Sequence, residues 1–418
     1  MIDNISRYIK ERSQRSYKQA GGLFKHPFID PGSVYQGNLW DWDSFWTVYA
    51  LMASAEDKEK LLSGAKGGLL NFFDLQMDDG YLPMMVSNQP EIGSYLLDQR
   101  KAGKKLNMHK PFLCQQAQII SSYAGSHEWL RQHLDGIRRY FACYDRDYLH
   151  EKTGLYVWAD DVMIGMDNDP AVFGRPRYST ASMFLNGFMV AELKAASRIF
   201  KALDLDNEGA AFIAKANALV SAIQTECYDS RDRFFYSVDV DIKTRAYDWF
   251  HQGLGVFWNS LPIKVRTWTG FIPLYAGFAT ESQARDIVRL HIEDATTFMS
   301  PNGIRALARD EKMYNLEATI NPSNWLGPIW MVVNYVVFRG LMNYGFREEA
   351  GRLMDKSINL LNKDLETSGE LHEYYNPETG HPIINPGFLN WNMLSINMYQ
   401  EFHGQGSVFD ALDYLALD

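Results

Sequence analysis

The sequence predicts an all-α protein in which paired helices follow one another through a single domain. Apolar residues recur with helical spacing from end to end, whereas long alternating strand patterns are scarce. No Pro-, Ser- or Gly-rich linker and no low-complexity block divides the chain, so we predict one domain over residues 1–418. Because 418 residues exceed the usual size of a single core, we expect one large closed architecture, with two domains as the alternative.

The expected helices follow in order along the chain. Amphipathic patterns predict them at residues 43–54, 58–75, 113–124, 129–145, 179–202, 206–227, 281–293, 328–344, 347–362 and 390–403. Short Gly-containing turns separate them, such as Asp79-Gly-Tyr-Leu-Pro83 and Pro377-Glu-Thr-Gly380. Helix, helix and turn recur at intervals of roughly 50 to 80 residues, which is too irregular for a short-period solenoid. Paired helices repeated in this way can close into a ring.

One segment, residues 86–112, interrupts the helical pattern. It has weak periodicity and a basic middle, Arg100-Lys-Ala-Gly-Lys-Lys105. A loop of this length is uncommon unless it is functional or mobile. We therefore predict a lid over a cavity, and a mobile surface insertion is the alternative.

Charge and cysteine content exclude several classes of protein. A formal charge of −10 and a pI near 5.5 argue against a nucleic-acid or membrane partner, which would require a basic face. The N-terminus lacks the apolar core of a signal peptide and no stretch approaches the ~20 apolar residues of a membrane span, so we expect a cytoplasmic protein. Cys114, Cys143 and Cys227 are widely spaced and odd in number, which is typical of reduced, buried thiols. No cluster has metal-ligand spacing, and we expect neither a metal nor a cofactor.

Aromatic residues make up 14% of the chain, with 11 Trp and 23 Tyr, more than a core alone requires. The densest patch is Tyr35-Gln-Gly-Asn-Leu-Trp-Asp-Trp-Asp-Ser-Phe-Trp46, which places two carboxylates among three tryptophans. Indole faces bind the C–H face of a pyranose while carboxylates accept from its hydroxyls, so this patch indicates a carbohydrate site. The alternative is a helix N-terminus, with Asp41 or Asp43 as cap or first-turn acid and the aromatic rings as core.

Two acidic clusters can supply the carboxyl pair that glycosidic hydrolysis requires, one to protonate the leaving oxygen and one to activate water. The first, Trp158-Ala-Asp-Asp-Val-Met-Ile-Gly-Met-Asp-Asn-Asp-Pro170, does not have the ligand spacing of an EF-hand. The second is Leu371-His-Glu-Tyr-Tyr-Asn-Pro-Glu-Thr-Gly380. The aspartates of the first cluster, Asp160, Asp161 and Asp169, are alternatively turn formers and local caps.

Five motifs in order resemble glycoside hydrolase family 63, most closely its short bacterial mannosylglycerate and glucosylglycerate hydrolases, and more distantly the trehalases. They are Gln36-Gly-Asn-Leu-Trp-Asp-Trp-Asp-Ser-Phe45, Gly165-Met-Asp-Asn-Asp-Pro170, Tyr178-Ser-Thr-Ala-Ser-Met-Phe-Leu-Asn-Gly187, Asn321-Pro-Ser-Asn-Trp-Leu-Gly-Pro-Ile-Trp-Met-Val-Val-Asn-Tyr335 and Glu373-Tyr-Tyr-Asn-Pro-Glu-Thr-Gly380. The resemblance implies an (α/α)6 toroid, or six-hairpin barrel, with long loops over a central cavity, and an inverting α-glycosidase.

The resemblance assigns roles to matching positions. Asp167 corresponds to the general acid and Glu373 to the general base. Substrate contacts are expected from Tyr35, Gln36, Trp40, Trp42, Asp43, Gln115, Arg177, Trp325, Gly327, Trp330, Tyr375 and Trp391. Asp169 and an apolar wall should raise the pKa of Asp167, and Glu373 should be ionised in a wetter setting. Inversion requires the two carboxyls to lie ~6.5–9.5 Å apart.

The expected substrate is a small α-glycoside, α-glucosylglycerate or α-mannosylglycerate by first hypothesis, because a closing lid excludes long glycans. Arg175, Arg177, His109 or Lys110 would then pair with the glycerate carboxylate, although surface exposure is the expected state of His109. Neutral disaccharides of the kojibiose, nigerose or trehalose type are one alternative, and a non-catalytic sugar-binding toroid is another. The oligomeric state, including a homo-oligomer, is left open.

Overall fold

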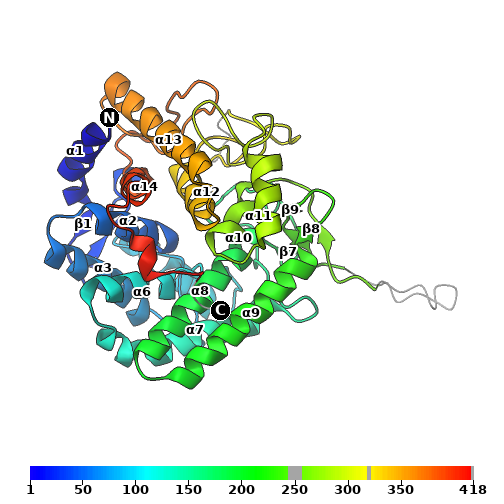
Figure 1. The fold of residues 1–418 in the computed structure, drawn as a ribbon. Helices are drawn as coiled ribbons and strands as arrows, with labels where there is room; N and C mark the ends of the chain where they lie inside the picture. The colour runs from blue at the N-terminus through cyan, green and yellow to red at the C-terminus, as the bar shows by residue number, and fades with distance from the viewer. Residues whose placement is uncertain (243–256, 318–321, 416–418) are drawn as a thin grey trace.

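The computed structural model describes residues 1–242, 257–317 and 322–415, and it is built mainly of helices (Figure 1). A first set of helices forms a closed ring, since each contacts the next and the last returns to the first. In order these are α2 (Asp41–Ser54), α6 (Leu113–Ala124), α8 (Met183–Ala202), α10 (Ile272–Tyr275), α12 (Met331–Asn343) and α14 (Leu394–Phe402). The predicted all-helical ring is therefore present in the described residues.

A second set of helices lies outside this ring (Figure 1). It contains α1 (Ile2–Ser13), α3 (Lys58–Asp74), α7 (Leu134–Asp147), α9 (Asp206–Glu226), α11 (Glu281–Ile287) and α13 (Arg347–Ser368). Burial separates the two sets: nearly all of α8 is buried, whereas α9 buries only Gly209, Ala216, Leu219 and Ile223. The inner helices thus form most of the core.

All ten predicted helices are found, with ends that differ by a few residues. The predicted 129–145 begins as a 3₁₀ turn at Glu128–His133 before α7, and the predicted 281–293 ends as a π turn at Val288–Ile292. The 390–403 segment likewise begins as a 3₁₀ turn at Asn390–Met393. Helices α1, α4, α5 and α10 were not predicted.

The strands are short and pair locally. They are β1 (Tyr17–Lys18) with β2 (Phe28–Ile29), β3 (Asn38–Trp40) with β4 (Met85–Ser87), β5 (Leu149–His150) with β6 (Leu155–Tyr156), β8 (Tyr228–Asp229) with β9 (Phe234–Phe235), and β10 (Val238–Asp239) between β7 (Thr180–Ala181) and β11 (Leu261–Pro262). All pairs are antiparallel. The β3–β4 pair fixes the chain where it enters α2.

The segment predicted as a loop at 86–112 is largely structured. It contains part of β4 and two short helices, α4 (Pro90–Gly93) and α5 (Tyr95–Lys101). Arg100 ties α5 to the body through Nη2, 2.6 Å from Asp79 Oδ2 and 2.5 Å from Asp147 Oδ2. The prediction of a long irregular loop was wrong, because helical turns and these ion pairs satisfy the backbone and the charge of its basic middle.

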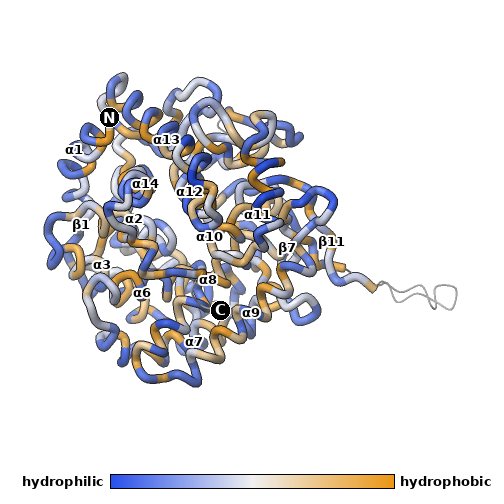
Figure 2. Tube along the Cα trace, viewed as in Figure 1, coloured by the Kyte–Doolittle hydropathy of each residue, from blue (hydrophilic) through white to orange (hydrophobic). Residues whose placement is uncertain are grey.

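Polar and apolar residues alternate along the helices (Figure 2). Within the described part of the chain, no helix is both long and apolar enough to cross a membrane. Cys114, Cys143 and Cys227 are free and buried, as predicted. Asn321, the first residue of one motif, lies outside the described residues.

Candidate active site

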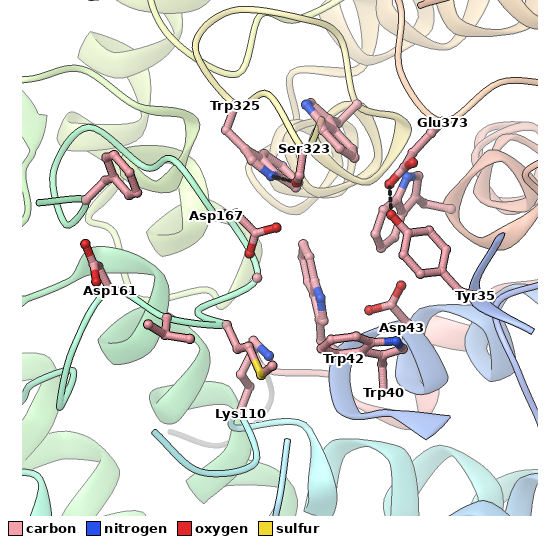
Figure 3. Close-up of a pocket in the computed structure, with 16 residues that line it drawn as sticks. Tyr35, Trp40, Trp42, Asp43, Lys110, Asp161, Asp167, Ser323, Trp325 and Glu373 are labelled. Atoms are coloured by element: carbon pink, nitrogen blue, oxygen red, sulfur yellow. Dashed lines mark hydrogen bonds between the residues drawn. The ribbon is translucent and has the colours of Figure 1, made fainter. Parts of the chain in front are cut away.

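A cavity of about 410 Å³ opens where several inner helices begin (Figure 3). Its lining comes from the first turn of α2 and from the segments that lead into α6, α8, α12 and α14. The lining residues are Tyr35, Trp40, Trp42, Asp43, Lys110, Asp161, Val162, Met163, Gly165, Asp167, Phe173, Ser323, Trp325, Trp330, Glu373 and Trp391. The ring therefore brings four of the five motif segments, far apart in sequence, to one place.

Glu373 lies on one side of the cavity and is 4% exposed. The Tyr35 hydroxyl donates to its Oε1 at 3.0 Å, and the Asn385 amide donates to its Oε2. Burial raises the pKa of Glu373 to about 7, Asp167 adds to the rise, and the two donors oppose it. The expectation of a wetter setting for this carboxyl was wrong, because the loop after Tyr374 folds back over it through Asn385.

Asp43 lies in the first turn of α2 and is buried. Its Oδ1 accepts from Asn390 Nδ2 at 2.8 Å, and Asn390 Oδ1 accepts in turn from the Thr47 hydroxyl at 2.9 Å. Burial raises the pKa of Asp43 well above its ordinary value, Lys110 lowers it, and the neighbouring carboxylates raise it further. The buried chain of hydrogen bonds fixes the side-chain rotamer of Asp43 at the cavity.

Asp167 faces the cavity from the side opposite Glu373 (Figure 3). The next residue, Asn168, anchors the loop: its Oδ1 accepts from the Trp325 backbone N–H at 2.7 Å and its Nδ2 donates to Asn324 Oδ1 at 3.2 Å. Asp169 is buried with a pKa raised to about 7 by desolvation, and its Oδ1 accepts from Ala171 N at 2.9 Å. Asp169 therefore holds a turn, which was the alternative interpretation of this residue.

Tryptophans form the walls of the cavity. Trp325 stacks on Trp330 with ring centroids 3.9 Å apart and planes 4° apart. Trp42 lies 5.8 Å from Trp325 and 5.2 Å from Trp391, between centroids. The indole N–H groups of Trp391 and Trp40 are buried without a hydrogen-bond partner. The walls thus offer apolar aromatic faces to the cavity.

Five predicted substrate contacts lie outside this cavity. Gln115 is fully buried, where its amide donates to Pro111 O at 2.5 Å and accepts from the Tyr414 hydroxyl. Tyr375 is also fully buried and donates to Asp364 Oδ2 on α13 at 3.0 Å. Both side chains are buried in packing between helices, away from this cavity.

The other three have equally specific local roles. Arg177 is exposed, donates to Lys105 O and lies 3.4 Å from Asp160 Oδ2. Gly327 has φ +138° and a Cβ there would lie 2.4 Å from the Tyr314 ring, so this glycine serves close packing. Gln36 is exposed and lines a separate cavity with Arg12 and Arg15.

Residues at or behind the cavity include Lys110 and His109, which the sequence offered as partners of a glycerate carboxylate, and Asn385 and Asn390, which it did not. Lys110 lines it and pairs with buried Asp41, 2.8 Å from Nζ to Oδ1. His109 is fully buried rather than exposed, because its ring packs against Phe72 at 4.6 Å. Asn385 and Asn390, which hold Glu373 and Asp43, both precede Trp391 in the sequence. Their closeness to this predicted site residue was the sequence feature that could have pointed to them.

The comparison with known structures identifies the fold as that of a glycoside hydrolase. The GH63 mannosylglycerate hydrolase from Thermus thermophilus, in complex with glucose, superposes with a TM-score of 0.68 at 19% identity, over 94% of this chain and 99% of that one. Residues 36–391 match the family described as "Mannosylglycerate hydrolase MGH1-like glycoside hydrolase domain". The chain therefore belongs to this MGH1-like family of glycoside hydrolase domains, within glycoside hydrolase family 63.

Two curated relatives match shorter segments. A mannosylglycerate hydrolase of Thermus thermophilus is 30% identical over 139 residues, which is 31% of this chain and 28% of the relative. Mannosylglycerate hydrolase MGH1 of Selaginella moellendorffii is 30% identical over 142 residues, 34% of this chain and 25% of the relative. The matched segments thus span about a quarter of the lengths of these relatives.

Proposed function

We propose that this chain is a single (α/α)6 catalytic domain over residues 1–418 that hydrolyses a small α-glycoside with inversion. The observation that carries the proposal is the placement of Asp167 and Glu373 on opposite sides of a tryptophan-walled cavity of about 410 Å³. The family membership supports the same activity.

In the proposed mechanism Asp167 is the general acid and Glu373 the general base. Glu373 removes a proton from a water molecule as its oxygen attacks the anomeric carbon. The bond from that carbon to the glycosidic oxygen breaks, and Asp167 gives its proton to the leaving oxygen. Tyr35 and Asn385 hold the Glu373 carboxylate in place for the water.

The sugar that is cleaved occupies the part of the cavity between Glu373 and the α2 helix. Asp43 accepts from sugar hydroxyls, while Trp42 and Trp391 contact the C–H face. Trp40 adds a further aromatic ring to the wall of the cavity.

Substrates to test first are α-mannosylglycerate and α-glucosylglycerate, because relatives of this chain are named mannosylglycerate hydrolases. Neutral disaccharides are the second candidate. The observation that favours them is the excess of carboxylates in the part of the lining that the structure describes, where Asp43, Asp161, Asp167 and Glu373 face one cation, Lys110.

Proton NMR of the first-formed anomer tests the reaction and its stereochemistry together. An inverting α-glycosidase releases the β-anomer first, because water attacks the face opposite the leaving group. We expect the β-anomer signal to appear before mutarotation and to be absent with Glu373→Ala. Release of the α-anomer first would overturn the inverting mechanism.

A further inference from the structure

We propose that the leaving-group side of the cavity selects an uncharged aglycone with an apolar face, such as a second pyranose ring, and disfavours a carboxylate-bearing aglycone such as glycerate. The inference rests on the proposed function, because it takes Asp167 as the general acid. It assigns the selectivity to Asp161, Val162 and Phe173.

The position of the acid defines where the aglycone lies. A general acid must contact the glycosidic oxygen, which joins the sugar to its aglycone, so the aglycone lies on the Asp167 side. Figure 3 places Asp161 on that side of the cavity with Asp167, whereas Tyr35, Asp43 and Glu373 lie on the other. The loop from Asp161 to Phe173 therefore forms much of the aglycone subsite.

This subsite presents apolar side chains to the solvent. Val162 is 55% exposed and Phe173 is 59% exposed, and both line the cavity. Large apolar groups that gather at the mouth of a pocket commonly mark a ligand surface. A Phe ring there stacks on the C–H face of a pyranose or on an aryl group, and it offers nothing to a carboxylate.

Hydrogen bonds hold this loop in place. Asn107 Nδ2 donates to Val162 O and to Asp160 O, each at 3.0 Å. Asp161 Oδ2 accepts from the Gly174 backbone N–H at 2.7 Å, directly after Phe173. Met163 keeps a left-handed φ of 55°, which a non-glycine residue adopts only where its surroundings impose it. The apolar platform is thus pre-formed.

The charges around the cavity oppose an anionic aglycone. Among the lining residues that the structure describes, Lys110 is the one cation, and its Nζ lies 2.8 and 3.2 Å from the two Asp41 oxygens. Both partners are fully buried, so the lysine charge is already neutralised. Asp161 is a further negative group on the aglycone side, and like charges in a site of low dielectric repel strongly.

The other cations that the sequence offered for glycerate are also engaged. Arg177 donates to Lys105 O and pairs with Asp160, and Arg175 pairs with Asp239. His109 Nδ1 donates to Lys110 O at 2.7 Å, and burial lowers the pKa of this ring, so it stays neutral. A glycerate carboxylate would meet none of these charges.

The wild-type test compares glycosides of one sugar that differ only in the aglycone, in both the α-gluco and α-manno series. The glycerol and glycerate glycosides are matched in size and differ by one carboxylate. We expect kcat/KM to be at least about tenfold higher for the glycerol compound and higher again for a disaccharide. Faster hydrolysis of the glycerate compound would overturn the proposal.

The α-glycosyl fluoride tests the hydrolytic activity separately from the aglycone subsite, because its leaving group is too small to reach Phe173. Turnover of the fluoride together with a preference for glycerate would reject the aglycone assignment and leave the proposed function standing. No turnover of any glycoside, the fluoride included, would reject both.

Two variants locate the selectivity. Phe173→Ala should lower kcat/KM about tenfold more for the disaccharide than for the fluoride. Asp161→Asn keeps the acceptor for Gly174 N and removes the charge, so it should raise the glycerate-to-glycerol ratio of kcat/KM several-fold. Phe257→Ala, at a residue that is 91% exposed and does not line the cavity, is the matched control. Variants that change kcat/KM by the same factor for every substrate would contradict the assignment of selectivity to Asp161 and Phe173.

Discussion

Glu373 shows how burial and hydrogen bonding together set the chemistry of one residue. Its pKa is raised to about 7, and the Tyr35 hydroxyl is one of two donors that hold it down. As a base it must be ionised, so kcat/KM should rise with pH through an apparent pKa of about 7. Tyr35→Phe removes a donor to the ionised form and should move this acid limb to higher pH.

A pH profile of kcat/KM for the wild type, Tyr35→Phe and a control, Tyr95→Phe, checks this expectation. Tyr95 is 53% exposed and does not line the cavity. An acid limb that lies at the same pH in Tyr35→Phe as in the wild type, or at lower pH, would show that Tyr35 does not stabilise the ionised base.

The acid and base roles predict a separation of turnover from binding. Asp167→Ala and Glu373→Ala should each lower kcat about 10²- to 10⁴-fold, the usual contribution of a positioned proton-transfer group. Sugar affinity by calorimetry should change little, because the tryptophan walls remain. Asp98→Ala, on the exposed part of α5, is the control. Wild-type turnover in both catalytic variants would refute the roles.

At the scale of elements, helix α5 shows what anchors the segment beside the cavity. Leu96 of α5 packs with Met84 and Met85, and Trp40 and Met163 from the cavity lining pack against this cluster. The Arg100 ion pairs hold the helix from the other side. Closure of this segment over a ligand remains a prediction.

Arg100→Ala should therefore affect both stability and substrate binding. Loss of the three charged hydrogen bonds to Asp79 and Asp147 should lower the free energy of unfolding by about 1.5–3 kcal/mol. Loosened packing on Trp40 should raise KM more than it lowers kcat. Urea unfolding and steady-state kinetics measure the two effects. Lys101→Ala, at a side chain that is 65% exposed, should change neither stability nor KM and is the control. An Arg100→Ala variant with the KM of the wild type would show that α5 does not support substrate binding.

The elements of the ring were largely predictable, and the supports of the site were not. Helical periodicity located ten helices, but α1 was missed although Ile5, Tyr8 and Ile9 have helical spacing, because its polar residues mask a short apolar stripe. Asp167, Glu373 and the tryptophans follow from motifs. Asn390 holds Asp43 from 347 positions away, a contact that no local pattern encodes.

At the scale of the whole molecule, buried carboxyls couple stability to pH. Burial raises the pKa of Glu192, Glu401, Asp169 and Glu373 to about 7 each. A carboxyl with a raised folded-state pKa stabilises the fold below its unfolded pKa of ~4, and this stabilisation is lost as pH rises through about 7.

We therefore expect the midpoint temperature of thermal unfolding to decrease as the pH is raised from 5.5 to 8. Glu373→Gln removes one such group, so its melting temperature should exceed that of the wild type at pH 8 and approach it near pH 5. Scanning calorimetry at both pH values measures this difference. A Glu373→Gln variant whose melting temperature at pH 8 does not exceed that of the wild type would contradict the cost in stability assigned to ionising Glu373.

The hydrogen bond from Asn390 to Asp43 also sets an order of events during synthesis. At about 5–20 residues per second, a ribosome needs roughly 20 to 70 s to make the chain between these two residues. Throughout that interval α2 has been made and α14, its neighbour in the ring, has not. The nascent chain therefore cannot act on sugars, and it carries an uncovered apolar helix that a chaperone can bind until the ring closes.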